Sequence, residues 1–389
     1  MTYSVYQHWD PLKVCALGRS YPPEFYSWIQ NKKVRKLFEK IAVETEEDYQ
    51  NIIKTLKSFD VKIVRTCIPE ETFFQGKHIS PPMTPRDITT MIGKKFYYSD
   101  GGLTFSIFYN NVKDPTWPKC NSLKEFYALP QNIIDECFKV HKLQDLLDLD
   151  KIKKKLFIEQ YQDILGLIQE QTNQIIPTCD TYSTIYSSGA MVSRIGRDLY
   201  FGTANYNDNI DDLKQAIDQE FPDTRNHIIN TGGHGDGTYC PVAPGLIISL
   251  RDVPTYADTF PDWEVIYLPN QSWSKVKPFL DLKKVNGGKW WIPGFEYDQA
   301  VIDTVASWLD HWTGYVAETV FDVNMLIIDP KNVMIFNYNK KVFDALDRYG
   351  ITAHVVPFRH RYFWDGGIHC VTCDLDREGS MQDYFPERG

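Results

Sequence analysis

Hydrophobic positions along the chain follow two periods, one typical of strands and one typical of helices. The first clear unit joins a short apolar strand at 13–18, a helix at 46–59 and a second strand at 61–65. The helix carries apolar residues three or four positions apart, at Tyr49, Ile52, Ile53, Leu56 and Phe59. Acidic residues at its start suit a helix N-terminus. The pattern therefore predicts a strand, helix, strand unit with short links.

The same succession recurs down the chain, with glycine or proline at the corners. Strands are predicted at 88–92, 191–195, 198–201, 228–230, 245–250, 264–268, 326–328, 333–336, 352–357 and 371–375. Helices are predicted at 155–171, 210–221, 299–312 and 341–349. Residues 101–175 break the pattern, and we expect their first part to form an irregular insertion or cover over a site. No linker divides the chain, so residues 1–389 are predicted to form a single α/β domain of repeated units.

Composition narrows the class of protein. The 389 residues are 43% hydrophobic and 14% aromatic, which is enough for a large core. The net charge is −9 and no long basic run is present, which argues against nucleic acid or an anionic membrane as a partner. No apolar stretch reaches the roughly 18 residues of a membrane helix. The N-terminus lacks the features of a signal peptide. Eight cysteines in such a chain favour reduced thiols, and we expect a cytoplasmic protein.

Three polar sites framed by glycine or proline carry the candidate chemistry. Cys370 follows Gly366, Gly367, Ile368 and His369 and precedes a predicted strand. A thiol nucleophile needs a histidine that is near in space. The candidate is His234, in the segment Gly232-Gly233-His234-Gly235-Asp236-Gly237-Thr238. The third site is Asp87, which follows Pro85 and Arg86.

Each of these residues also has an ordinary structural explanation. Cys370 could be a buried core thiol, His234 a structural histidine, and Asp236 or Asp87 a turn cap. Cys370 and Cys373 form a C-x-x-C pair, but no second ligand pair for zinc is visible. The residues after Cys373 resemble a strand end, whereas a thioredoxin-like motif opens a helix. No metal site is therefore predicted.

A cysteine, a histidine and carboxylates suit attack on the planar cationic carbon of a guanidinium. The thiolate is the nucleophile, and a nearby positive charge lowers the pKa of a thiol. A guanidinium substrate supplies such a charge, and carboxylates bind it through paired hydrogen bonds. The histidine can protonate the departing amine and then deprotonate the incoming nucleophile.

The motifs resemble those of the guanidino-group-modifying enzyme superfamily, most closely the glycine (arginine:glycine) amidinotransferases. The matching segments are Trp9-Asp10-Pro11-Leu12, Pro85-Arg86-Asp87, His234-x-Asp236-x-Thr238-Tyr239 and Gly366-Gly367-Ile368-His369-Cys370-Val371-Thr372-Cys373-Asp374. The resemblance implies a five-bladed α/β propeller, known as the pentein fold, built of ββαβ units with pseudo-fivefold symmetry. It implies Cys370 as nucleophile, His234 as general acid and base, and Asp236 and Asp87 as acids that bind the guanidinium or orient the histidine. It implies no cofactor.

One segment departs from the family pattern. Ser188 and Met191 stand where the family has acidic residues, so one guanidinium-binding carboxylate is missing. Asp322 is a candidate replacement. Arg251, near the place of the family's arginine for the substrate carboxylate, and Asn324 are further candidate substrate-binding residues, each with an equally good structural explanation. Strand alternation predicts that the neighbours His369 and Cys373 point away from Cys370 and are structural.

The motifs predict an amidinotransferase that moves the amidino group of arginine, or of a related guanidine, to an amine such as glycine or another amino acid. The intermediate would be a covalent amidino-cysteine. Two alternatives stay open: a hydrolase of the same superfamily, which is a deiminase or dihydrolase, and a non-catalytic propeller that binds a ligand or a partner. The expected partners are small-molecule substrates, and a homodimer is left open.

Overall fold

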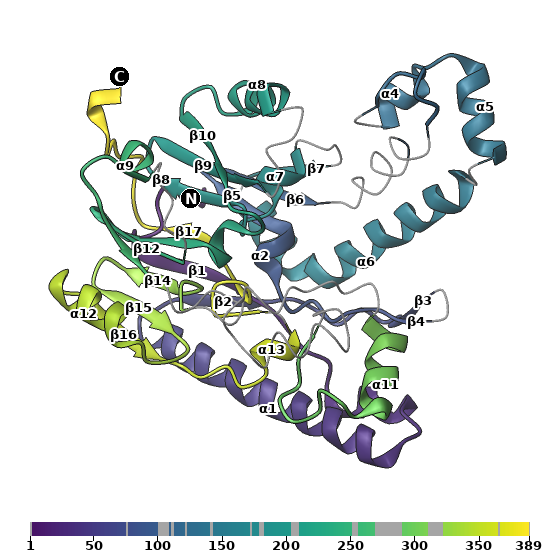
Figure 1. The fold of residues 1–389 in the computed structure, drawn as a ribbon, viewed down its shortest axis with the longest axis horizontal. Coiled ribbons are helices and arrows are strands. Elements are labelled where there is room, and N and C mark those ends of the chain that lie inside the picture. Colours follow the sequence, from purple (N-terminus) through teal and green to yellow (C-terminus); the bar gives the residue numbers. More distant parts are fainter. Residues whose placement is uncertain are drawn as a thin grey trace.

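The main strands of the protein form five small sheets, as its computed structural model shows (Figure 1). The structure describes residues 2–74, 77–99, 109, 113–120, 123–140, 143–171, 173–178, 183–203, 210–250, 256–268, 290–309, 322–364 and 366–388. Among these residues a sixth sheet is a two-stranded hairpin, formed by β3 (Phe73–Phe74) and β4 (Lys77–His78).

Each of the five sheets has three strands. The first contains β17 (Thr372–Arg377), β1 (Leu12–Leu17) and β2 (Lys62–Arg65). The second contains β5 (Thr89–Ile92), β6 (Lys95–Ser99) and β7 (Gln174–Thr178). The third contains β8 (Val192–Ile195), β9 (Asp198–Thr203) and β10 (Arg225–Asn230). The fourth contains β11 (Tyr239–Ala243), β12 (Leu246–Ser249) and β13 (Glu264–Tyr267). The fifth contains β14 (Leu326–Asp329), β15 (Asn332–Ile335) and β16 (Thr352–Val355).

All five sheets share one pairing pattern. The first two strands of each sheet pair antiparallel, and the second and third pair parallel. Antiparallel neighbours can be joined by a tight turn, but parallel neighbours need a crossover, which is usually a helix. The crossover helices are α1 (Lys32–Lys57), α6 (Leu143–Glu170), α8 (Ile210–Glu220), α9 (Tyr256–Thr259) and α12 (Lys340–Arg348). The described part of the chain thus contains five repeats of one ββαβ topology.

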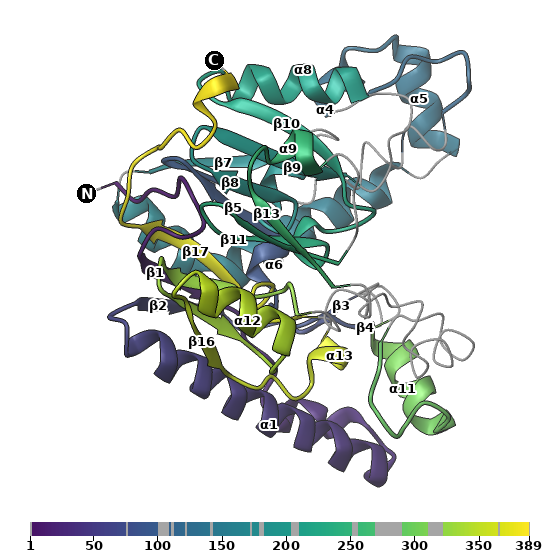
Figure 2. The same ribbon diagram turned by 60° about the vertical axis from the view of Figure 1, so that its left-hand side comes forward.

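The two ends of the chain meet in the first sheet. β17, near the C-terminus, pairs with β1, near the N-terminus, with Ala16 opposite Cys373 (Figure 2). β17 also lies against β5 of the second sheet, and β1 lies against β14 of the fifth. The strand that follows Cys370 is therefore held on both sides by strands from distant parts of the chain.

The described residues contain further helices. They are η1 (Pro23–Trp28), α2 (Pro85–Ile88), α4 (Leu123–Tyr127), α5 (Gln131–Val140), α7 (Ser183–Ser187), η2 (Gly235–Gly237), α11 (Gln299–Leu309), α13 (Arg361–Trp364) and η6 (Pro386–Arg388). Helices α4 and α5, with the first turns of α6, project from the body (Figure 1). They have a small core of their own, formed by Tyr109, Cys120, Phe126, Ile133, Ile134 and Cys137.

Most predicted elements are confirmed, but two helices begin earlier than predicted. The helix predicted at 46–59 begins at Lys32, where Asn31 caps it by accepting the N–H groups of Lys33 and Val34. The helix predicted at 155–171 begins at Leu143. Within residues 101–175, α4, α5 and the first half of α6 are regular helices, while residues 101–108 lie outside the described part of the chain. No strand was predicted at β6, β7 or β11. Residues 310–312 of the helix predicted at 299–312 lie outside the described part of the chain.

No helix in the described residues is long and apolar enough to cross a membrane. The buried apolar residues instead pack between the sheets and their helices. The largest cluster joins β1, α1, α11 and the segment before Cys370, with Phe38, Trp308, Phe363 and Trp364 among its aromatic members. This packing fixes the backbone on which Cys370 stands.

Candidate active site

Cys370 lies in a helical turn that ends directly before β17. The N–H of Val371 donates to the carbonyl oxygen of Gly367 at 3.1 Å, which closes the turn. The Cys370 side chain is only 1% exposed. The prediction that Cys370 lies just before a strand is confirmed. However, the residue before it belongs to a turn, so strand alternation does not decide where His369 points.

Asn324 contacts the sulfur of Cys370. Its Nδ2 lies 3.0 Å from Cys370 Sγ. Its Oδ1 accepts the backbone N–H of His369 at 3.0 Å and that of Cys370 at 3.3 Å. Asn324 is fully buried against Gly367, where a Cβ atom would stand 2.2 Å from Asn324 Oδ1. We predicted Asn324 as a substrate ligand, but here its amide binds the candidate nucleophile.

Asp236 lies on the other side of Cys370. It belongs to η2, and its Oδ2 is 3.7 Å from Cys370 Sγ and 2.8 Å from His369 Nδ1. Burial, with the positive charge of Arg86, lowers the pKa of His369 well below its usual range. A neutral His369 therefore donates Nδ1–H to the carboxylate. The prediction that His369 points away from the site is wrong, whereas Cys373 is buried with its thiol toward the carbonyl oxygen of Thr89.

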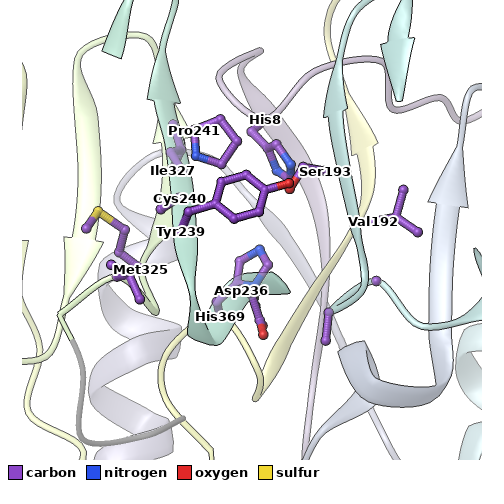
Figure 3. A pocket seen from close by; sticks show the side chains of 13 residues that line it. His8, Val192, Ser193, Asp236, Tyr239, Cys240, Pro241, Met325, Ile327 and His369 are labelled. Carbon is purple, nitrogen blue, oxygen red and sulfur yellow. Dashed lines mark hydrogen bonds and ion pairs between the residues drawn. The ribbon is translucent and has the colours of Figure 1, made fainter. Parts of the chain in front are cut away.

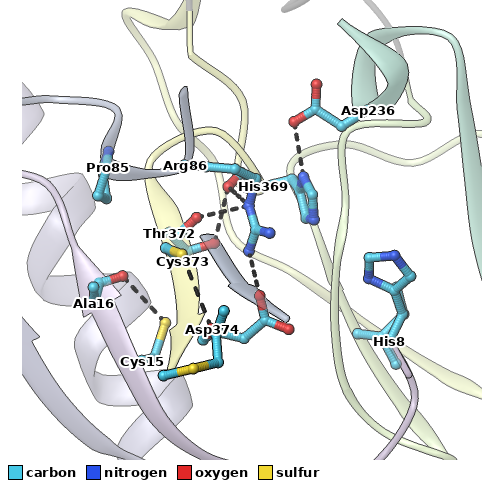
Figure 4. Close-up of polar contacts among 12 residues, drawn as sticks. His8, Cys15, Ala16, Pro85, Arg86, Asp236, His369, Thr372, Cys373 and Asp374 are labelled. Atoms are coloured by element: carbon cyan, nitrogen blue, oxygen red, sulfur yellow. Dashed lines mark hydrogen bonds and ion pairs between the residues drawn. The ribbon is translucent and has the colours of Figure 1, made fainter. Parts of the chain in front are cut away.

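A buried charge cluster surrounds Asp374, and Figure 4 shows the ion pair of this residue with Arg86. Asp374 contacts the guanidinium groups of Arg86 at 3.1 Å, Arg194 at 2.8 Å and Arg377 at 2.7 Å. Burial alone would raise the pKa of Asp374, but the three arginines outweigh it and hold that pKa well below the usual range.

Arg86 links this charge cluster to the Cys370 turn. Its Nε donates to the carbonyl oxygens of His369 and Thr372, both at 2.8 Å. These two carbonyls stand on either side of Cys370 in the sequence. Arg86 therefore holds the backbone that carries the thiol.

The side chains of His234 and Asp87 face each other. His234 directly precedes η2, and Asp87 lies in α2. His234 Nδ1 lies 3.9 Å from Asp87 Oδ1, and both side chains are partly exposed. Asp87 belongs to α2, directly after Arg86, so one helical turn carries a contact to the Cys370 turn and a contact to His234. The structure thus pairs the four predicted residues as Cys370 with Asp236 and His234 with Asp87.

The other predicted residues have different surroundings. Asp322 is buried, and its Oδ2 accepts a hydrogen bond from Asn339 Nδ2 at 2.6 Å. Arg251 lies outside the described residues. Ser188 is buried, and its Oγ has no hydrogen-bond partner among the described residues.

A small cavity lies behind His369 (Figure 3). Its volume is about 10 Å³, which is close to the room that one water molecule needs. His8 and His369 line it, with Ser193, Asp236 and Tyr239. His8 was not predicted as a site residue, because it stands in no motif that the sequence made visible.

Arg86, Arg194 and Asp374 were also missed as a group. Arg86 and Asp374 appear in motif segments and Arg194 does not, and only the burial of the three side chains around one another reveals their role. Within the described residues, no three His, Cys, Asp or Glu side chains are grouped to hold a metal ion.

Comparison with known proteins finds amidinotransferases among the similar sequences and among the similar solved structures. No protein-family model matches the chain. The mitochondrial glycine amidinotransferase of Xenopus laevis is 22% identical over 422 residues, covering 98% of this chain and 84% of that protein. The L-arginine:L-lysine amidinotransferase of Pseudomonas savastanoi pv. phaseolicola is 21% identical over 240 residues, covering 60% and 55%.

Among solved structures, SxtG, an amidinotransferase of the saxitoxin biosynthetic pathway from Microseira wollei, has a similar fold. It is 15% identical, with a TM-score of 0.59, and the match covers 98% of this chain and 99% of that chain. The predicted resemblance to the amidinotransferases is therefore confirmed in sequence and in fold.

Proposed function

We propose that this chain, which resembles the amidinotransferases over nearly its whole length, transfers the amidino group of arginine or a related guanidine to an amine acceptor. Glycine or another amino acid is the proposed acceptor. The observation that carries the proposal is the environment of Cys370, whose sulfur lies between the Asn324 amide and the Asp236 carboxylate. Few structural roles call for a buried thiol with a hydrogen-bond donor on one side and an acid on the other.

The charges at this site favour a cationic substrate. A thiolate at Cys370 would stand 3.7 Å from the Asp236 carboxylate. Two like charges at this distance repel by about 4 kcal/mol at the effective dielectric of a partly screened protein site. A guanidinium bound to Asp236 would turn this repulsion into attraction, because the cation would neighbour both anions.

The proposed reaction has two half-reactions with the same nucleophile. The Cys370 thiolate adds to the guanidinium carbon, and the tetrahedral adduct expels the amine of ornithine after that nitrogen gains a proton from His234. The product is an amidino-cysteine. His234 then takes a proton from the acceptor amine, which adds to the amidino carbon and expels the Cys370 thiolate. The sum is arginine plus amine giving ornithine plus a new guanidine.

The remaining site residues keep their proposed roles around these steps. Asp87 would orient His234, since its carboxylate faces the imidazole at 3.9 Å. Asp236 would bind the guanidinium. Arg251 stays a prediction for the substrate carboxylate, and Asp322 stays a prediction for the missing acid.

The repeated topology supports the finer architecture. We expect the five ββαβ units to be the blades of a five-bladed α/β propeller of the pentein kind, forming one domain that β17 closes by pairing with β1. Assembly as a homodimer stays a prediction. Localisation to the cytoplasm also stays a prediction. Free thiols at the seven described cysteines favour it, whereas the name of the Xenopus laevis relative places that protein in mitochondria.

The test is incubation with arginine and a panel of amines, with ornithine and new guanidino compounds measured by mass spectrometry. Cys370→Ser should abolish turnover without unfolding the protein, because the exchange is nearly isosteric. Cys373→Ser is the matched control, since Cys373 is equally buried but faces the carbonyl oxygen of Thr89. Citrulline and ammonia from arginine alone would decide for a hydrolase. Absence of every product across the panel would reject catalysis on arginine and favour a binding propeller.

A further inference from the structure

Asn324 uses both ends of its amide on the same short turn. Oδ1 accepts the N–H groups of His369 and Cys370, and Nδ2 points to Cys370 Sγ at 3.0 Å. The orientation of the amide is determined by this arrangement. If it were flipped, the NH2 group would face two N–H donors, and the carbonyl oxygen would face the sulfur. The group that meets Cys370 Sγ is therefore a hydrogen-bond donor.

A donor at this position distinguishes the two protonation states of the thiol. A neutral thiol sulfur is a weak acceptor, whereas a charged acceptor makes a hydrogen bond about twice as strong. The contact from Asn324 therefore strengthens when Cys370 loses its proton. The contact from Asp236 acts in the opposite direction, because that carboxylate accepts the S–H proton and repels the thiolate.

We propose that Asn324 is a catalytic residue that stabilises the Cys370 thiolate by donating Nδ2–H to its sulfur. The assignment rests on the proposed function only in that Cys370 is the reacting atom. Other charged groups face the turn from the elements around it. Asp236 does so from η2, Arg86 from α2, and Asp374 from β17, with His369 beside Cys370. Asn324 places a hydrogen-bond donor directly on the sulfur.

Gly367 offers a second, independent position at which to test the proposal. A Cβ atom at this position would stand 2.2 Å from Asn324 Oδ1 and 2.7 Å from its Cγ. The turn therefore needs glycine here because the Asn324 amide occupies the space that a side chain would fill. Gly367→Ala should displace the amide and reproduce the effect of removing it.

The experiment measures alkylation of Cys370 by iodoacetamide as a function of pH, read by mass spectrometry of the Cys370 peptide. The thiolate displaces iodide, so the rate follows the ionised fraction. Access to the buried sulfur scales the rate equally at every pH, and the pH midpoint therefore reports ionisation. In Asn324→Asp, which keeps an acceptor for the two N–H groups, the midpoint should rise by about one to two pH units. Asn324→Ala should shift it in the same direction.

The matched control is Asn332→Asp on β15. Asn332 is partly buried, and its amide donates to Asp329 and accepts from His354, away from the Cys370 turn. This variant should leave the midpoint within about 0.3 pH unit of wild type, well inside the shift expected from losing a charge-assisted hydrogen bond. An unchanged midpoint in both Asn324 variants would overturn the proposal.

Gly367→Ala tests the same contact without altering Asn324. Its midpoint should rise as in Asn324→Ala, and the double variant should shift no further than the larger single effect, because both changes remove one contact. Additive shifts would refute the shared cause. If the Asn324 variants do not fold, the Gly367→Ala midpoint alone decides, and a wild-type midpoint there contradicts the proposal. The assay needs no substrate, so a shift without amidino transfer would reject the proposed function and keep this inference.

Discussion

Mild acid should destabilise this protein through His8, a histidine buried beside the charge cluster. His8 is 4% exposed, and its Nε2 accepts the backbone N–H of Arg194 at 3.1 Å. Burial, followed by the charge of Arg194, lowers the pKa of His8 well below its usual range. Arg377 and Arg86 act in the same direction, and only Asp374 opposes them. Protonation would also break the hydrogen bond to Arg194, because the lone pair of Nε2 would be lost.

The sign and size of the effect follow from linkage. The unfolded chain binds a proton at His8 below about pH 6.5, whereas the folded chain does not until the pH falls to its depressed folded pKa. Stability is therefore fully present above about pH 6.5 and is lost as the pH falls from there, by about 1.4 kcal/mol per pH unit. Between pH 7 and pH 5 the loss from this one residue is about 2 kcal/mol.

The assay is urea unfolding of wild type and His8→Gln at pH 7, 6 and 5. Glutamine keeps an oxygen that can accept the Arg194 N–H but has no proton to gain in this range. The variant should be less stable than wild type at pH 7, and the difference between them should shrink by about 2 kcal/mol at pH 5. Parallel stability curves across this range would refute the reasoning, since they would show that His8 is protonated in the folded protein.

Four further substitutions test the stability of the fold and the binding of substrate. Asp374→Asn should lower the free energy of unfolding by about 3–5 kcal/mol in urea titrations, because buried arginine charges lose their counterion; a loss below 1 kcal/mol would contradict the charge cluster. Ser188→Asp should tighten arginine binding about tenfold or more in calorimetry, by restoring an acid beside an otherwise family-like site; tight binding by wild type with no gain would show that this segment is wrongly aligned. Gly196→Ala should cost about 1–3 kcal/mol in thermal unfolding, because its φ is +63° and a Cβ would stand 2.1 Å from the Gln382 carbonyl oxygen. In Gly166→Ala, with nothing within 4 Å, a gain of about 0.5–1 kcal/mol is expected instead.

Local pattern alone was enough to predict most elements of the fold. The strands on both sides of Gly196, the strand after Gly245 and the helices α8 and α12 agree with their predicted positions within a few residues. Periodicity and turn residues act over a few neighbouring positions, so a sequence displays them directly. The early start of α1 was missed because apolar residues in its first turns stand among many charged ones, and its cap is the single residue Asn31.

Only the tertiary structure decided which polar residues meet. Asp236 lies 134 residues before Cys370, and Asn324 lies 46 residues before it, yet both contact its sulfur. Arg86 reaches the carbonyl oxygen of His369 across 283 residues. Such partners follow from the pairing of β17 with β1 and from the packing of α2 and η2 around the turn, and no periodicity encodes them. A residue's type limits the bonds it can make, but burial and the position of distant strands decide which of those bonds form.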